Sequence, residues 1–227
     1  MDIMNIVSAV LVLFIMGVVF ALLLGIAAKV FAVEVDERVP LVRECLPGAN
    51  CGGCGYAGGD AMAAAIGEGT APVNGCPVGG AACAAKIAEV LGVEAEAAAP
   101  KVAHVHCNGG CNAIDKAKYE GLQDCSAAMR VAGGPKECAF GCMGLGSCVK
   151  ECAFDAIHIV DGKALVDPEK CVACGKCVAA CPKHLIDLVP KAQKVHVNCM
   201  NHDRGAQAMK VCSNACIGCM KCEKPCK

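Results

Sequence analysis

The sequence has few aromatic residues and no charge along most of its first thirty positions. It contains no Trp, two Tyr and five Phe among 227 residues, so aromatic residues make up 3% of the chain. A large core packed around aromatic side chains is therefore not expected. Residues 6–28 carry no charged side chain. As a helix this segment would be about 35 Å long, enough to cross the roughly 30 Å hydrocarbon layer of a membrane.

Sequence signals for several other functions are also missing. The glycine-rich loop at residues 51–60 lacks the preceding strand and the Gly-Lys-Ser/Thr ending of a phosphate-binding loop. No glycine-rich segment has the strand-to-helix setting of a Rossmann fingerprint, and no flavin attachment signature is present. We therefore expect this chain to bind neither NAD nor flavin, to have no catalytic residue of its own and to bind no nucleic acid.

Cysteine, by contrast, is abundant, with 22 residues, and its spacing is informative. Residues 171–182 follow the pattern C-x2-C-x2-C-x3-C-P, which binds 4Fe–4S clusters in bacterial ferredoxins. Three thiolates of such a run hold one cluster, and the fourth reaches the neighbouring cluster. The four cysteines of this run are Cys171, Cys174, Cys177 and Cys181.

An irregular relative of this run precedes it, and the two runs are expected to exchange their last cysteines. It comprises Cys138, Cys142, Cys148 and Cys152, with Leu145 where the second cysteine of a regular run would stand. The exchange predicts one cluster on Cys152, Cys171, Cys174 and Cys177. It predicts a second on Cys142, Cys148 and Cys181, with Cys138 replacing the missing ligand.

Zinc and disulfide bonds are the other common uses of many cysteines. C-x2-C pairs also bind zinc, but zinc sites do not usually show three cysteines at two-residue gaps followed by C-P. Disulfide-rich scaffolds are typical of secreted domains, whereas a membrane anchor would leave these cysteines on the cytoplasmic side. Several 4Fe–4S clusters, at least three, are therefore the expected cofactors.

The uncharged segment is expected to belong to a retained membrane anchor, residues 1–30. A signal peptide begins with basic residues and has a shorter apolar core, whereas this chain begins with Asp2 and no Lys or Arg. Lys29, Arg38 and Arg43 follow the segment. The positive-inside rule then predicts a single-pass protein of the cell membrane, with its N-terminus outside and its cluster domains in the cytoplasm.

The rest of the chain is expected to be α+β. Asp60 is expected to cap a helix that runs to about Ile66, and the next helix should end near Gly92. Two β-rich tetrads flank Asp161-Gly162, which predicts a hairpin with a type I′ turn. The predicted segments are a small helical module at 34–92, a linker at 93–101, a ferredoxin-like unit with two clusters at 102–190, and the start of a second such unit at 191–227.

An internal repeat with an offset of 74 residues supports tandem units. It maps Cys125, Cys138, Cys142, Cys148 and Cys152 onto Cys199, Cys212, Cys216, Cys222 and Cys226. Cys219 completes a regular run in the second copy, so Cys216, Cys219, Cys222 and Cys226 are also predicted cluster ligands. The partner run of this copy would begin beyond Lys227, and we expect the native protein to continue into it.

Beyond residue 100, five cysteines belong to none of these predicted ligand sets. Two interpretations stay open for them: they hold one further cluster, or they are a mixture of buried thiols and accessory ligands. They are Cys107, Cys111, Cys125, Cys199 and Cys212.

The order of anchor, glycine-rich module and ferredoxin units resembles the B subunit of the Rnf complex. The segment Leu46-Pro-Gly-Ala-Asn-Cys51-Gly-Gly-Cys54-Gly-Tyr is similar to the 4Fe–4S module of that family, also found in corrinoid iron–sulfur proteins. The resemblance implies ligands at Cys51, Cys54 and Cys76. The family's third cysteine would fall at Gly59, so we expect Cys45 to replace it, with Cys83 as the alternative.

The resemblance implies a component of a ferredoxin:NAD⁺ oxidoreductase that couples electron flow to Na⁺ or H⁺ transport. This chain would take electrons from soluble ferredoxin and pass them to other membrane and peripheral subunits. Residues 1–100 hold four basic and ten acidic residues, whereas residues 101–227 hold 17 basic and 12 acidic residues. The second part is therefore basic overall and could attract an acidic ferredoxin. The alternatives are a redox-regulatory membrane protein that keeps a transcription factor reduced, and a zinc-binding scaffold.

Overall fold

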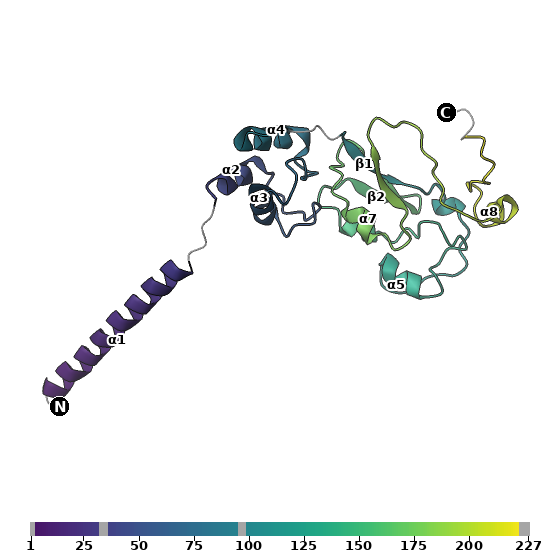
Figure 1. Ribbon diagram of the computed structural model, residues 1–227. Helices are drawn as coiled ribbons and strands as arrows, with labels where there is room; N and C mark the ends of the chain where they lie inside the picture. The colour runs from purple at the N-terminus through teal and green to yellow at the C-terminus, as the bar shows by residue number, and fades with distance from the viewer. Residues whose placement is uncertain (1–2, 32–35, 95–98, 223–227) are drawn as a thin grey trace. The chain divides into compact units, whose positions relative to one another are not determined.

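The computed structural model describes residues 3–31, 36–94 and 99–222, and the chain divides into two units, Met1–Glu37 and Arg38–Lys227. The described part of the first unit contains helix α1 (Ile3–Val30), drawn in purple in Figure 1. Its segment Val10–Val30 is long and apolar enough to cross a membrane, and none of that segment is buried within the protein. The predicted N-terminal apolar helix is therefore confirmed.

The second unit begins with three short helices that we call the helical module, residues 38–92. They pack around one apolar core in which Val42, Met62 and Ile87 are almost fully buried. The last helix ends at Gly92, whose left-handed backbone (φ 67°) is the conformation that glycine adopts most readily at a helix C-terminus, as predicted. The helices are α2 (Arg38–Cys45), α3 (Gly59–Gly67) and α4 (Gly80–Leu91).

The expected cap of α3 was wrong. Asp60 lies inside the first turn of the helix, and its carboxylate accepts a hydrogen bond from Arg43 Nε at 2.6 Å. Asn50 instead caps the helix, because its side-chain oxygen accepts the Gly59 N–H at 3.0 Å. The glycine-rich loop thus folds back on the start of α3, and its Cys54 packs against the helical core.

The remainder of the second unit, residues 101–222, is the ferredoxin unit, and it contains two small antiparallel sheets. In one, β1 (Lys101–Val105) pairs with β4 (Ile186–Pro190); in the other, β2 (Ile157–Val160) pairs with β3 (Lys163–Val166). Asp161 and Gly162 both have positive φ, 49° and 72°, as a type I′ turn requires, so the hairpin prediction is confirmed.

Short helical turns lie between and beyond these strands, as Figure 1 shows. Two-stranded sheets are only marginally stable by themselves. The apolar core between the sheets is small, and several cysteines, including Cys148, are part of it or pack against it. A bound metal cluster would supply the cohesion that so small a core lacks. The helical elements are η1 (Gly110–Asn112), α5 (Cys125–Arg130), α6 (Ser147–Lys150), α7 (Lys176–Ala180) and α8 (Gly205–Val211).

Candidate iron–sulfur sites

Four cysteines surround a cavity beside β1 and α7, which we call cage A. They are Cys152, Cys171, Cys174 and Cys177, the set predicted from the exchange of runs. Backbone N–H groups point at two of the sulfurs: Ala103 donates to Cys171 Sγ and Ala156 to Cys152 Sγ, both at 3.4 Å. Such N–H groups stabilise thiolate and sulfide charge, which helps to set the potential of a cluster.

The four sulfurs of cage A influence one another electrostatically. Burial raises the pKa of the Cys177 thiol to about 11, and the neighbouring sulfurs of Cys171, Cys174 and Cys152 contribute to that rise. Four thiolates this close repel one another unless a cation lies between them. Iron between the sulfurs would remove that repulsion, so the donor set fits a cluster.

A second cavity, cage B, lies on the other side of the same core. It is lined by Cys125, Cys142, Cys148 and Cys181, with Ile159 and Leu185 among its apolar walls. The pKa of the Cys148 thiol is raised to about 12 by burial first, and then by the sulfurs of Cys142, Cys125, Cys181 and Cys177. Because Cys177 belongs to cage A, the two cages are close neighbours.

Cys125 lines cage B, whereas Cys138, which was predicted to complete this ligand set, lines a different cavity. The Cys125 N–H donates to Ser147 Oγ at 2.7 Å, and the same hydroxyl donates to Asp124 Oδ2 at 2.7 Å. Asp124 also caps α5, since its carboxylate accepts the Ala127 N–H, and these two hydrogen bonds lower the pKa of the carboxyl. Ser147 precedes Cys148, so this network fixes the start of α5 beside the cage.

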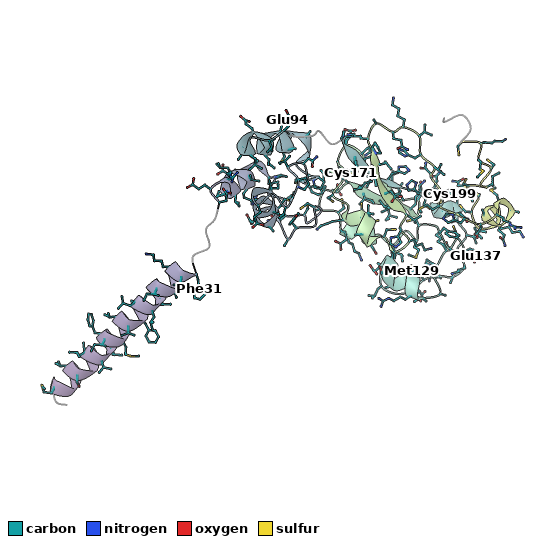
Figure 2. All side chains as sticks on the ribbon, viewed as in Figure 1. Phe31, Glu94, Met129, Glu137, Cys171 and Cys199 are labelled. Atoms are coloured by element: carbon teal, nitrogen blue, oxygen red, sulfur yellow. The ribbon has the colours of Figure 1, made fainter. Side chains whose placement is uncertain are left out.

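The other cysteines predicted outside the helical module fall into two groups. Cys107, Cys138, Cys199 and Cys212 line a third cavity, which we call cage C. Cys111, Cys219 and Cys222 are exposed and Cys216 is half-buried, and none of these lines any of the three cages. Cys226 lies outside the described residues. In Figure 2, Cys171 of cage A and Cys199 of cage C are labelled and lie well apart.

The helical module places its cysteines at helix ends and in the glycine-rich loop. Cys45 ends α2, and Cys45, Cys54 and Cys76 all pack against the apolar core. Cys83 is buried within α4 and donates its thiol hydrogen to the Cys45 carbonyl oxygen at 3.0 Å. Burial, then the sulfurs of Cys76 and Cys45, raise the pKa of the Cys83 thiol to about 11.

Arg43 fills the space beside Gly59, where the family carries its third cysteine. A Cβ built on Gly59 would meet the Arg43 guanidinium at 3.0–3.2 Å. The side chain that holds Asp60 therefore also covers the position of the absent ligand. Cys45, at the C-terminal end of α2, and Cys83, within α4, remain the two candidates for the missing ligand.

The cysteines do not converge as they would on a single metal ion. All 21 cysteines in the described residues are free, and no three His, Cys, Asp or Glu side chains among those residues are close enough to share an ion. Thiolates on one zinc lie about 3.8 Å apart, because each is about 2.3 Å from the ion. Sulfurs spread around a cavity fit a cluster of several irons instead.

Comparisons with known proteins agree with this chemistry. A family model for a putative Fe-S cluster matches residues 46–78, and the 4Fe-4S binding domain model matches residues 164–187. With many cysteines at both places, iron–sulfur groups are the cofactors of this chain.

Several curated proteins are similar over most of the chain. The B subunit of the Na(+)-translocating ferredoxin:NAD(+) oxidoreductase complex of Acetobacterium woodii is 55% identical over 90% of this chain. Its counterpart in the ion-translocating oxidoreductase complex of Methanosarcina acetivorans is 41% identical, over 93% of this chain and 81% of that protein. The counterpart in the proton-translocating ferredoxin:NAD(+) oxidoreductase complex of Clostridium ljungdahlii is 43% identical, over 94% of this chain and 76% of that protein.

The alignment with the Acetobacterium woodii protein spans 62% of that protein's length. The relatives from Methanosarcina acetivorans and Clostridium ljungdahlii are covered over more than two thirds of their lengths. With the cage geometry and both family models, this shows that the chain belongs to the Rnf family of B subunits of ion-translocating oxidoreductase complexes.

Proposed function

We propose that this chain is a membrane-anchored electron relay that accepts electrons from reduced soluble ferredoxin and passes them to other subunits of an Rnf-type complex. Each bound cluster would take up and release one electron at a time. Cage A and cage B would hold 4Fe–4S clusters through the sulfurs named above. Cys45, Cys51, Cys54 and Cys76 would hold another in the helical module, and Cys216, Cys219, Cys222 and Cys226 remain proposed ligands of a further one.

The observation that carries this proposal is the closeness of cages A and B. Cys148 of cage B is buried in the same apolar core against which Cys177 of cage A packs. Cage walls of apolar side chains, such as Ile157 in A and Ile159 in B, limit the access of water. Several adjacent redox sites suit a conduit, whereas a redox sensor or regulator needs only one.

The helical module meets cage A at a glycine. A Cβ on Gly53, which lies between Cys51 and Cys54, would be 2.4 Å from the Cys174 carbonyl oxygen. Only glycine allows two backbones to approach so closely. The loop of the module therefore lies directly against a ligand of cage A, which supports electron transfer between the two sites.

The proposed direction of flow runs from the basic ferredoxin unit to the module that follows the membrane helix. Residues 101–227 carry 17 of the 21 basic residues, which favours encounter with an acidic ferredoxin. The positive charges after α1 favour a single-pass orientation with the N-terminus outside. Coupling to Na⁺ or H⁺ transport, NAD⁺ and flavins would belong to the assembled complex and its other subunits.

Mixing the anaerobically purified full-length chain with reduced soluble ferredoxin tests the proposal. We expect rapid bleaching of the absorbance near 400 nm, with a rate that falls as salt is added, because salt screens attraction between the partners. A pre-oxidised ferredoxin is the control and should cause no bleaching. Iron-containing protein that reduced ferredoxin does not bleach would refute the relay, and colourless folded protein would refute the cofactors.

A further inference from the structure

Cage C is formed by segments that are far apart in the sequence. Cys107 follows β1 and pairs with Cys199 in an isolated antiparallel bridge. Ala113 pairs in the same way with Cys212, and the Ile114 N–H donates to the Val211 carbonyl oxygen at 2.9 Å. These bonds hold the segment after β1 against the segment around α8 and bring three of the four sulfurs to one cavity. Cys138 of the irregular run supplies the fourth.

The cage C sulfurs are sheltered and closely approached by backbone. Cys138 and Cys212 are buried, with 6% and 5% of their surface exposed, and Cys107 and Cys199 are half-buried. A Cβ on Gly109 would lie 3.3 Å from Cys212 Sγ and 3.6 Å from Cys107 Sγ, so glycine gives the two sulfurs room. Four sulfurs around one sheltered cavity form a donor set that fits a 4Fe–4S cluster.

Each of three cage C sulfurs also accepts an N–H group, as sulfurs of cage A do. The Cys142 N–H donates to Cys107 Sγ and the Cys216 N–H to Cys199 Sγ, both at 3.3 Å. The Asn201 side-chain amide donates to Cys138 Sγ at 3.9 Å. Hydrogen bonds of this kind stabilise negative charge on a ligand sulfur. Such hydrogen bonds are expected around the sulfur ligands of a cluster.

We infer that Cys107, Cys138, Cys199 and Cys212 bind an additional 4Fe–4S cluster that continues the relay beyond cage B. The inference rests on the proposed function, since it extends the same series of redox sites. Cys142 lines cage B, and its N–H donates to Cys107 Sγ of cage C, so a backbone hydrogen bond links the two sites. One electron gained at cage B is one electron lost at cage C, and no proton or other reactant is needed.

The deciding experiment compares Cys212→Ala with Cys111→Ala in the full-length chain made without oxygen. Cys111 is exposed and lines none of the three cages, so its substitution controls for the loss of a thiol. We expect Cys212→Ala to contain about four fewer irons per chain, or about one fewer with conversion to a three-iron cluster. Cys111→Ala should keep all its iron, and the EPR signals of cages A and B should persist in both.

Equal iron content and identical Mössbauer spectra in the two variants would overturn the inference while leaving the relay intact. If the unsubstituted chain contains no iron, the proposed function fails as well, so the two failures are distinguishable. If Cys212→Ala does not fold, Asn201→Ala decides, because it removes a hydrogen bond to Cys138 Sγ and no ligand.

Asn201→Ala should lower the midpoint potential of one cluster, because a hydrogen bond to a ligand sulfur favours the reduced form. Its control is Asn198→Ala, since the Asn198 side chain pairs with His104 and not with a sulfur. An EPR-monitored potentiometric titration measures both. A folded Asn201→Ala chain whose cluster potentials all equal those of the control would refute a cluster in cage C.

Discussion

In the helical module the cysteines are placed by the packing of three helices, whereas in the ferredoxin unit the cysteines themselves are much of the core. Val42, Met62 and Ile87 give the module an apolar centre of its own. Cages A and B instead lie between two-stranded sheets, with Cys148 buried in the core. The difference illustrates two ways to hold the same cofactor: a fold that presents ligands, and ligands that complete the fold.

Removing iron should affect the two regions most unequally. Chelation under anaerobic conditions should abolish hydrogen-exchange protection in β1–β4, because these strands have little cohesion without the clusters. The amides of α3 and α4 should keep a substantial part of their protection, since their apolar core remains. Hydrogen exchange followed by mass spectrometry measures both. Equal loss of protection in the two regions would contradict the comparison.

Cys125→Ala should remove the cluster of cage B, about four irons per chain, and destabilise the strands around it. Iron and sulfide analysis, with EPR for the clusters that remain, measures the loss. The paired control is Cys83→Ala in the module, which should keep all its iron because the Cys83 thiol donates its hydrogen to the Cys45 carbonyl oxygen. If Cys83→Ala lost iron and Cys45→Ala did not, Cys83 and not Cys45 would be the module's fourth ligand.

The module should tolerate relocation of a ligand, which the ferredoxin unit should not. Cys45→Ala is expected to lose about four irons. Adding Gly59→Cys to it should restore them, because only the flexible Arg43 side chain has to move away from the new Cβ. Iron content of the single and double variants tests this. Full iron in Cys45→Ala by itself would show that Cys45 is not a ligand.

Gly53→Ala should leave the iron content unchanged and slow electron transfer between the module and cage A. The new methyl group would meet the Cys174 backbone, so the loop must move away from its neighbour. Rapid-freeze EPR after mixing with reduced ferredoxin follows the order in which clusters are reduced. Gly48→Ala is the matched control, since a Cβ there meets nothing within 4 Å. Equal rates in both variants would contradict transfer at this contact.

The smallest effect is expected from Ser147→Ala. It leaves the Cys125 N–H without its acceptor and should lower stability by about 1–3 kcal/mol without removing iron. Thermal unfolding of the iron-loaded chain measures the change. An unchanged melting temperature would show that cage B does not depend on this network.

The regular elements and cage A were predictable from the sequence because they depend on local spacing. The C-x2-C-x2-C run and the Asp161-Gly162 turn each act over a few residues. Which of Cys125 and Cys138 lines cage B could not be predicted from the sequence. It depends on the hydrogen bond between Ser147 and Asp124, which are 23 positions apart. A signal did exist, since Cys125 takes part in the 74-residue repeat, but a repeat does not say which cavity a cysteine faces.

Cage C was less accessible to sequence reasoning, because two β-bridges between distant segments assemble it. Cys107 and Cys199 are 92 positions apart, and nothing in their local sequence requires that they pair. The surroundings of the absent cysteine in the module could not be predicted either, because they depend on packing: Arg43 from α2 covers the position of Gly59 in α3.

The hydrogen bond from the Cys142 N–H to Cys107 Sγ affects how electrons would be added to clusters in cages B and C. Two centres linked so directly feel each other's added negative charge, and that repulsion is little screened inside a protein. Reducing one cluster would lower the midpoint potential of the other. The pair would therefore titrate anticooperatively, and each apparent midpoint potential would belong to the pair and not to one cluster. Only one of the two centres would then be reduced at a time, so electrons would pass through this pair one after another.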